Sequence, residues 1–289
     1  MRLIRDLLSL REDTVEDGQK PTVTDLGKLT DADLADLLHK NCKGAMEYLI
    51  TSTGWPVGDH DDFPTIYRGD KTLSDNSLIS TAGSTRKSTG IENYHTAIMD
   101  NTPSMKGFPK RGSSLIASTS VRSARFYSHN VFCIVPFDNA KVAVCHTDDI
   151  WGALISFMGV KHKTITGINE IFSKAKIEDS WEGIKKFAKE LAGDGPEAEK
   201  ALADLKNACE LYSITGTNLD VTLQRAKEDF MGEIDKMFSP SETGFNWRYG
   251  RDLESVLSPF SELWIEGEMV AIEPEVYKNT LAAYGKKYT

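Results

Sequence analysis

The chain has 289 residues, of which 40% are hydrophobic and 27% charged, a composition typical of a globular protein and unlike that of a disordered one. The formal net charge of −9 argues against a basic surface that coats nucleic acid. The four cysteines show no redox or metal-binding spacing, and no apolar run approaches the roughly 18 residues that cross a membrane, so we expect a reduced, cytoplasmic protein without a membrane partner.

The charge is unevenly distributed along the chain. Residues 65–130 contain nine basic and four acidic side chains, a net +5, which leaves −14 for the rest. A basic segment in an acidic protein indicates a local anionic ligand. A solvated face balanced by acids elsewhere in the fold would give the same numbers, so both interpretations stay open.

The first 60 residues are predicted to form a helical N-terminal segment. Thr30 can cap a helix that extends to about residue 50, where glycines and a proline end it. Residues 63–68 then predict a short strand that stops at Gly69, and residues 71–90 predict a loop.

The middle and end of the chain alternate between strands and helices. Residues 114–120 predict a strand that leads into helical turns, and apolar strands are predicted at 131–135 and 141–145. Residues 165–238 have apolar residues at helical spacing and predict a helical insert, so that 61–164 and 239–289 form one interrupted domain. Residues 262–272 predict a strand pair or one long bent strand, before a closing helix at 277–284. The sequence thus predicts an α+β fold.

Three short polar motifs lie on these predicted strands. They are Arg68 at a strand end, then Ser118-Thr119-Ser120, and then Glu266-Gly267-Glu268. Two glutamates at positions i and i+2 project from the same side of a strand, which is unfavourable unless a ligand compensates their charge. Taken singly, the motifs have structural explanations as an ion pair, a helix cap and a solvated strand face.

In this order and strand context, the three motifs resemble the arginine–serine–glutamate group of mono-ADP-ribosyltransferases, which includes cholera-toxin-like and clostridial exoenzyme-like toxins and enzymes of tailed phages. The resemblance spans residues 65–144 and 261–272, about a third of the chain. It implies a split, mostly antiparallel β-sandwich with NAD in its cleft. It also implies transfer of ADP-ribose to a macromolecule, in particular an arginine of a host protein, with RNA left open as an acceptor. A phage-encoded enzyme of this kind would act in the host cytoplasm, where the virion could deliver it.

The resemblance also implies roles for individual residues. A carboxylate beside the ribose would stabilise the cationic transition state, and a second would activate the acceptor. The resemblance gives these two roles to Glu268 and Glu266, respectively. Arg68, with Gly69 beside it, would bind the pyrophosphate, and the basic loops would add Arg86 and Arg111 against the phosphates. Ser118 would fix the glutamate and the ribose, whereas Thr119 and Ser120 would cap the following turn and hold the strand end.

Several alternatives remain at this level. The register of the third motif is open because Glu262 also lies near the strand start, although an apolar strand follows Glu268 directly. The same residues would serve an NAD glycohydrolase, and a phage or virion structural protein could keep the fold without catalysis. No metal site is predicted: residues 59–62 offer ligand types, but consecutive side chains cannot all face one ion.

Overall fold

The computed structural model describes residues 19–51, 65–85, 93–147, 150–255, 257–258 and 260–288. Arg86 and the polar run at 59–62 lie outside these ranges. The chain forms two compact units. One comprises Met1–Thr89, Phe108–Asp149 and Asn246–Thr289, and the other Gly90–Gly107 and Ile150–Phe245.

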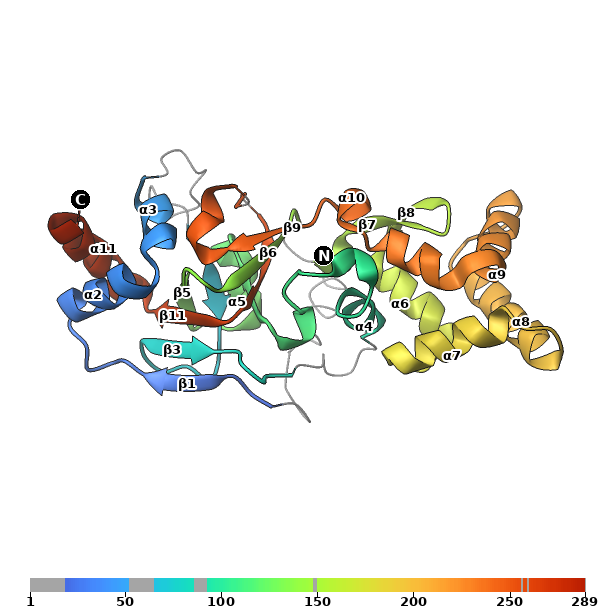
Figure 1. Ribbon diagram of the computed structural model, residues 1–289, viewed down its shortest axis with the longest axis horizontal. Coiled ribbons are helices and arrows are strands. Elements are labelled where there is room, and N and C mark those ends of the chain that lie inside the picture. Colours follow the sequence, from blue (N-terminus) through green and yellow to red (C-terminus); the bar gives the residue numbers. More distant parts are fainter. Residues whose placement is uncertain are drawn as a thin grey trace. The chain divides into compact units, whose positions relative to one another are not determined.

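The first unit is built on a nine-stranded sheet in which every pairing is antiparallel (Figure 1). The strand order is β1-β3-β11-β5-β2-β4-β10-β6-β9. The predicted α+β class and mostly antiparallel sheet are therefore confirmed. The bounds are β1 (Thr22–Asp25), β2 (Tyr67–Gly69), β3 (Ser77–Ser80), β4 (Leu115–Ser118), β5 (Val131–Pro136), β6 (Lys141–Cys145), β9 (Asn246–Tyr249), β10 (Glu262–Glu266) and β11 (Glu268–Ile272).

The two halves of this sheet meet at the short strand β2. It pairs with β5 at three positions but with β4 only through Tyr67 and Ser118. The chain also crosses from one half to the other at Gly267, because β10 pairs with β4 and β6 whereas β11 pairs with β3 and β5. Gly267 has φ +128°, a conformation that residues with a side chain rarely adopt. Residues 262–272 are thus two strands that belong to different halves of the sheet.

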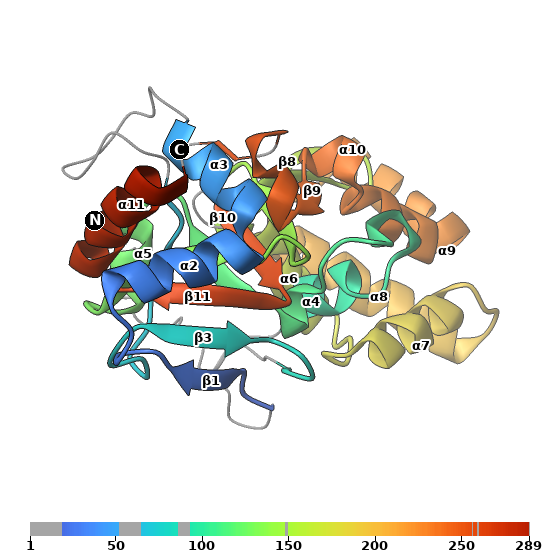
Figure 2. The ribbon, with the colours of Figure 1, turned by 60° about the vertical axis from the view of Figure 1, so that its left-hand side comes forward.

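Helices cover part of the sheet in this unit. The predicted helix at 30–50 is two helices, α2 (Asp31–Asn41) and α3 (Lys43–Thr51), which meet at Cys42. The closing helix α11 (Pro274–Tyr288) is longer than predicted and lies beside α2 (Figure 2). A hydrophobic core joins α2 and α3 to the strands, and Leu263 and Ile265 of β10 belong to it.

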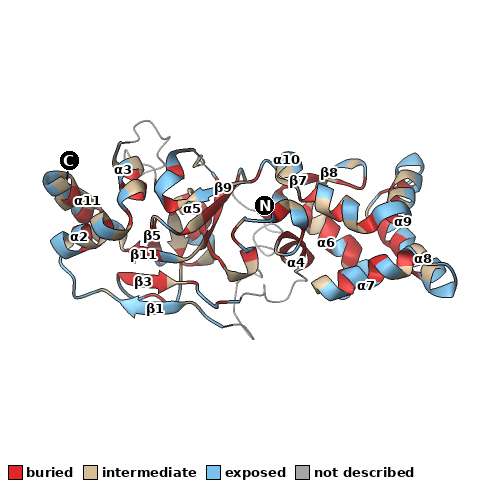
Figure 3. Ribbon diagram, viewed as in Figure 1, coloured by how far each residue is buried: buried red, intermediate tan, exposed pale blue. Residues whose placement is uncertain are grey.

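The alternation of side chains along the strands creates a second, more polar sheet face. In β10, Glu262, Trp264 and Glu266 point away from the core that holds Leu263 and Ile265. The register pairs Glu262 with Ser118 of β4 and with Cys145 of β6. Most residues of β4, β6 and β10 are nevertheless buried. Figure 3 shows the contrast with the exposed edge strand β1.

The second unit is mainly helical. Its bounds are α4 (Tyr94–Met99), β7 (Leu154–Phe157), β8 (Val160–Thr164), α6 (Ile165–Lys174), α7 (Trp181–Leu191), α8 (Pro196–Leu211), α9 (Thr217–Met237) and α10 (Pro240–Thr243). This unit exceeds the predicted insert at 165–238 because it also takes in the β7–β8 hairpin and residues 90–107. The aromatic core explains the addition. The Tyr94 ring meets Phe172 edge-on at 5.6 Å, and its hydroxyl donates to the Ile177 carbonyl at 2.6 Å.

Candidate functional site

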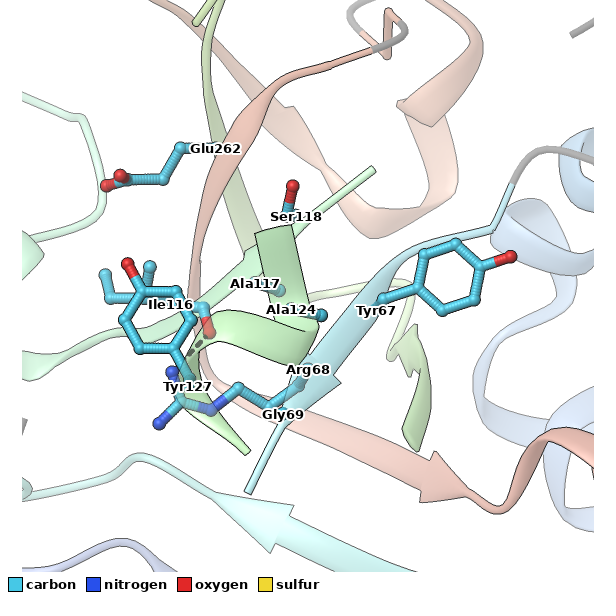
Figure 4. A pocket seen from close by; sticks show the side chains of 9 residues that line it. All are labelled: Tyr67, Arg68, Gly69, Ile116, Ala117, Ser118, Ala124, Tyr127 and Glu262. Carbon is cyan, nitrogen blue, oxygen red and sulfur yellow. Dashed lines mark hydrogen bonds between the residues drawn. The ribbon is translucent and has the colours of Figure 1, made fainter. Parts of the chain in front are cut away.

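A pocket lies at the narrow junction between β2 and β4. Its lining comes from β2, β4, β10 and the short helix α5 (Val121–Tyr127) (Figure 4). The lining residues are Tyr67, Arg68, Gly69, Ile116, Ala117, Ser118, Ala124, Tyr127 and Glu262. Two residues singled out in the sequence, Arg68 and Ser118, therefore line the same pocket, together with a glutamate.

Several contacts fix the Arg68 guanidinium at this pocket. Nη1 donates to the Ile116 carbonyl at 2.8 Å, Nε lies 3.6 Å from Asp70 Oδ2, and the guanidinium carbon lies 5.7 Å from the centre of the Tyr127 ring. Burial raises the pKa of the Asp70 carboxyl, but the Arg68 charge and hydrogen bonds from Thr72 outweigh it and hold that pKa below its usual value. A fixed arginine fork beside a pocket can bind a phosphate or carboxylate.

Gly69 allows α5 to lie directly against β2. A Cβ atom at this position would be 2.1 Å from the carbonyl oxygen of Ala124 and 2.8 Å from the Ser128 nitrogen. Only a glycine therefore fits between the strand and the helix. The same close approach brings Tyr127 of α5 over Arg68.

The Ser118-Thr119-Ser120 motif joins three parts of the site. Ser118 is buried in the pocket wall, and its Oγ accepts a hydrogen bond from the Ser120 N–H at 3.0 Å. Thr119 binds the segment before β10: its Oγ1 donates to the Ser258 carbonyl at 2.9 Å and accepts from the Ser261 N–H at 2.8 Å. The Ser120 side chain caps α5 by accepting from the Ser123 N–H at 3.2 Å.

Glu262 supplies the carboxylate of this pocket. It begins β10 directly opposite Ser118, and only 2% of its surface is exposed. Its Oε1 accepts a hydrogen bond from Trp264 Nε1 at 2.7 Å and lies 3.4 Å from Arg111 Nη2. Arg111, predicted to contact phosphates, is thus buried against Glu262.

The predicted pair Glu266 and Glu268 does not line the pocket. Glu266 lies at the opposite end of β10 from Glu262, about 13 Å away along the strand, and its Oε2 accepts a hydrogen bond from the Lys110 backbone at 2.8 Å. Glu268 is the exposed first residue of β11, beyond the Gly267 crossover. The sequence pattern did not reveal this separation. Alternation along a strand shows which residues share a face, but only the strand pairing shows that the face of Glu262 is the one that meets Ser118.

The four cysteines provide no nucleophile near the pocket. All are buried free thiols, and Cys145 faces Glu262 from β6. Burial, together with the negative charge of Glu262, raises the pKa of the Cys145 thiol to about 12, so it stays protonated at neutral pH. Within the described ranges, no cluster of three or more His, Cys, Asp or Glu could hold a metal ion, and no helix has both the length and the apolar character to cross a membrane.

Comparisons with known proteins add no family assignment. No protein-family model matches the chain, and no curated protein matches it. Among solved structures, a mutant of phosphomannose isomerase from Salmonella typhimurium aligns over 90% of this chain and 72% of its own, with 12% identity and a TM-score of 0.15. So low a score carries no argument about fold or activity.

Proposed function

We propose that the protein is an NAD-dependent mono-ADP-ribosyltransferase whose site is the pocket of Arg68, Ser118 and Glu262. An arginine, a serine and a buried carboxylate from three different strands line one pocket, and this observation supports the proposal most directly. The three residue types and their chain order are those of the resemblance, with Glu262 in the place expected for Glu268. The same proposal includes a sheet that is split as the resemblance implies, with NAD bound in the split.

Each of these residues has a definite role in the proposed reaction. When the bond between nicotinamide and ribose breaks, nicotinamide leaves as a neutral ring and positive charge develops on the ribose. The Glu262 carboxylate would stabilise that charge, and the Ser118 hydroxyl would orient a ribose hydroxyl beside it. Arg68, fixed by the Ile116 carbonyl and Tyr127, would bind the pyrophosphate. The attacking group then bonds to the ribose carbon and loses its proton.

A matched pair of variants tests the assignment of the carboxylate. Glu262→Gln should lower nicotinamide release from NAD by about 100-fold or more, because it removes the charge that stabilises the transition state. Glu268→Gln makes the same change on an exposed residue outside the pocket and should leave the rate within about twofold. The measurement is the rate of nicotinamide release at saturating NAD. If Glu268→Gln abolished release and Glu262→Gln did not, the site would lie at the start of β11 instead.

Whether the acceptor is a macromolecule or water requires a second measurement. The expectation of an arginine acceptor depended on two glutamates two residues apart, but the residue two before Glu262 is Phe260, an exposed aromatic at φ +56°. NAD labelled in its adenylate moiety, incubated with the enzyme and a bacterial lysate, should transfer label to protein. Label in RNA would identify a nucleic-acid acceptor, and free ADP-ribose alone would identify an NAD glycohydrolase. A wild-type protein that neither binds nor cleaves NAD would support the non-catalytic alternative.

A further inference from the structure

A buried arginine that does not line the pocket contacts the Glu262 carboxylate. Arg111 is 6% exposed, and its Nη2 is 3.4 Å from Glu262 Oε1. Trp264 completes the arrangement, since its Nε1 donates to the same oxygen at 2.7 Å and its ring centre lies 5.9 Å from the Arg111 guanidinium carbon. Two donors therefore converge on a single carboxylate oxygen.

The segment that bears Arg111 is anchored along the same sheet face. The Phe108 ring lies 6.3 Å from the ring of Trp247 on β9, and the Lys110 backbone donates to Glu266 at the end of β10. The Ser114 hydroxyl also donates to the Lys110 carbonyl at 2.7 Å, which closes the turn around Arg111. These contacts lie on both sides of Arg111 and anchor its backbone against the sheet.

The ion pair between Arg111 and Glu262 has an electrostatic effect in addition to its packing. A carboxylate that is removed from water loses hydration energy and ionises less readily unless a cation or hydrogen bonds compensate. The titratable and charged groups around Glu262 include Arg111, Cys145 from β6, and Arg68 and Tyr127, which line the same pocket. Cys145 stays neutral, and Arg68 is held against Ile116 and Asp70, so Arg111 supplies the positive charge that contacts the carboxylate directly.

We propose that Arg111 is a positioning residue: it keeps Glu262 ionised and oriented for the reaction, and it does not bind the phosphates of NAD. This inference rests on the proposed function, because Glu262 must act as a carboxylate in the reaction. The two roles of Arg111 differ in their kinetics. A phosphate ligand contributes to KM, whereas a residue that orients the carboxylate contributes to kcat.

The test compares Arg111→Met with Lys110→Met, which removes an exposed positive charge from the neighbouring position. Arg111→Met should lower kcat for nicotinamide release at least about tenfold with KM for NAD within about twofold, and the acid limb of the kcat profile should move to higher pH. Lys110→Met should match the wild type in both. A rise in KM alone, or an unchanged kcat and acid limb in Arg111→Met, would overturn the proposal.

Two further variants keep the outcome decisive. If Arg111→Met does not fold, Arg111→Lys retains the charge at a shorter reach, and it should lower kcat without raising KM and leave the acid limb near its wild-type position. Glu262→Gln is measured in parallel. Activity in the wild type that is lost in Glu262→Gln but kept in both Arg111 variants would refute only the role of Arg111. A wild type that releases no nicotinamide would refute the proposed function and this role with it.

Discussion

At the scale of single residues, contacts of a few atoms determine whether the pocket can form. Gly69 lines the pocket, yet its clearest role is steric, because a Cβ atom there would overlap the backbone of α5 at Ala124. Moving the backbone of β2 or α5 to make room for a side chain would cost free energy. The absence of a side chain at position 69 is thus a condition for placing Tyr127 over Arg68.

Gly69→Ala should therefore destabilise the protein by about 1–3 kcal/mol, the usual cost of forcing extra atoms into a packed site. The free energy of unfolding in urea measures this. Gly152→Ala is the control, because a Cβ atom at Gly152 would meet nothing within 4 Å. Equal stability of the two variants would show that α5 does not lie as close to β2 as the structure indicates.

Asp70 makes the stability of the protein depend on pH. Its carboxyl has a lowered pKa in the folded state, so it binds protons less readily there than in the unfolded chain, where the pKa is about 3.9. The stability that it contributes is complete above the unfolded pKa and is lost as the pH falls through the folded value. Asp70→Asn should be less stable than the wild type at neutral pH, and the difference should shrink below about pH 4. Urea unfolding at several pH values measures this, and a constant difference across that range would contradict it.

At the scale of the elements, helix α2 begins with a complete capping box. The Thr30 side chain accepts from the Asp33 N–H at 3.2 Å, while Asp33 Oδ2 accepts from the Thr30 N–H at 3.0 Å. This reciprocal pair satisfies two backbone donors that a helix start would otherwise leave exposed. It fixes where α2 starts, and α2 in turn lies beside α11.

Thr30→Ala should lower the free energy of unfolding by about 1 kcal/mol, because the alanine side chain cannot accept the cap hydrogen bond. Thr30→Ser keeps the hydroxyl and should stay within about 0.5 kcal/mol of the wild type. Thermal and urea unfolding of the three proteins provide the comparison. An alanine variant as stable as the serine variant would mean that the cap adds nothing to the stability of this unit.

At the scale of the whole molecule, each of the two units has its own hydrophobic core. Ile265 is fully buried in the core of the sheet unit, and Ile234 of α9 is fully buried in the helical unit. Separate cores commonly unfold as separate cooperative units.

We therefore expect two transitions in calorimetry. Ile265→Ala should lower the temperature of one and Ile234→Ala that of the other, each by an amount that corresponds to about 2–5 kcal/mol. A single transition that both substitutions shift equally would show that the units unfold together.

The sequence by itself determined the elements whose signals are local. The cap at Thr30, the apolar strands at 131–135 and 141–145, and the amphipathic helices after residue 165 all follow from neighbouring residues, and the structure has them. Strands with few apolar residues escaped prediction: β1 has four exposed residues, and β3 lies within a segment predicted as a loop. Such strands form because a neighbour in the sheet offers hydrogen bonds, a condition that is not written in the segment itself.

The tertiary structure alone decided which carboxylate lines the same pocket as Arg68 and Ser118. Glu262, Glu266 and Glu268 lie within seven residues of one another, and local pattern favoured Glu268 because an apolar strand follows it. The antiparallel register places Glu262 opposite Ser118, and the left-handed turn at Gly267 directs Glu268 into the other half of the sheet. Pairing register depends on contacts between residues more than a hundred positions apart, so the position of the candidate carboxylate could be known only once the sheet was assembled.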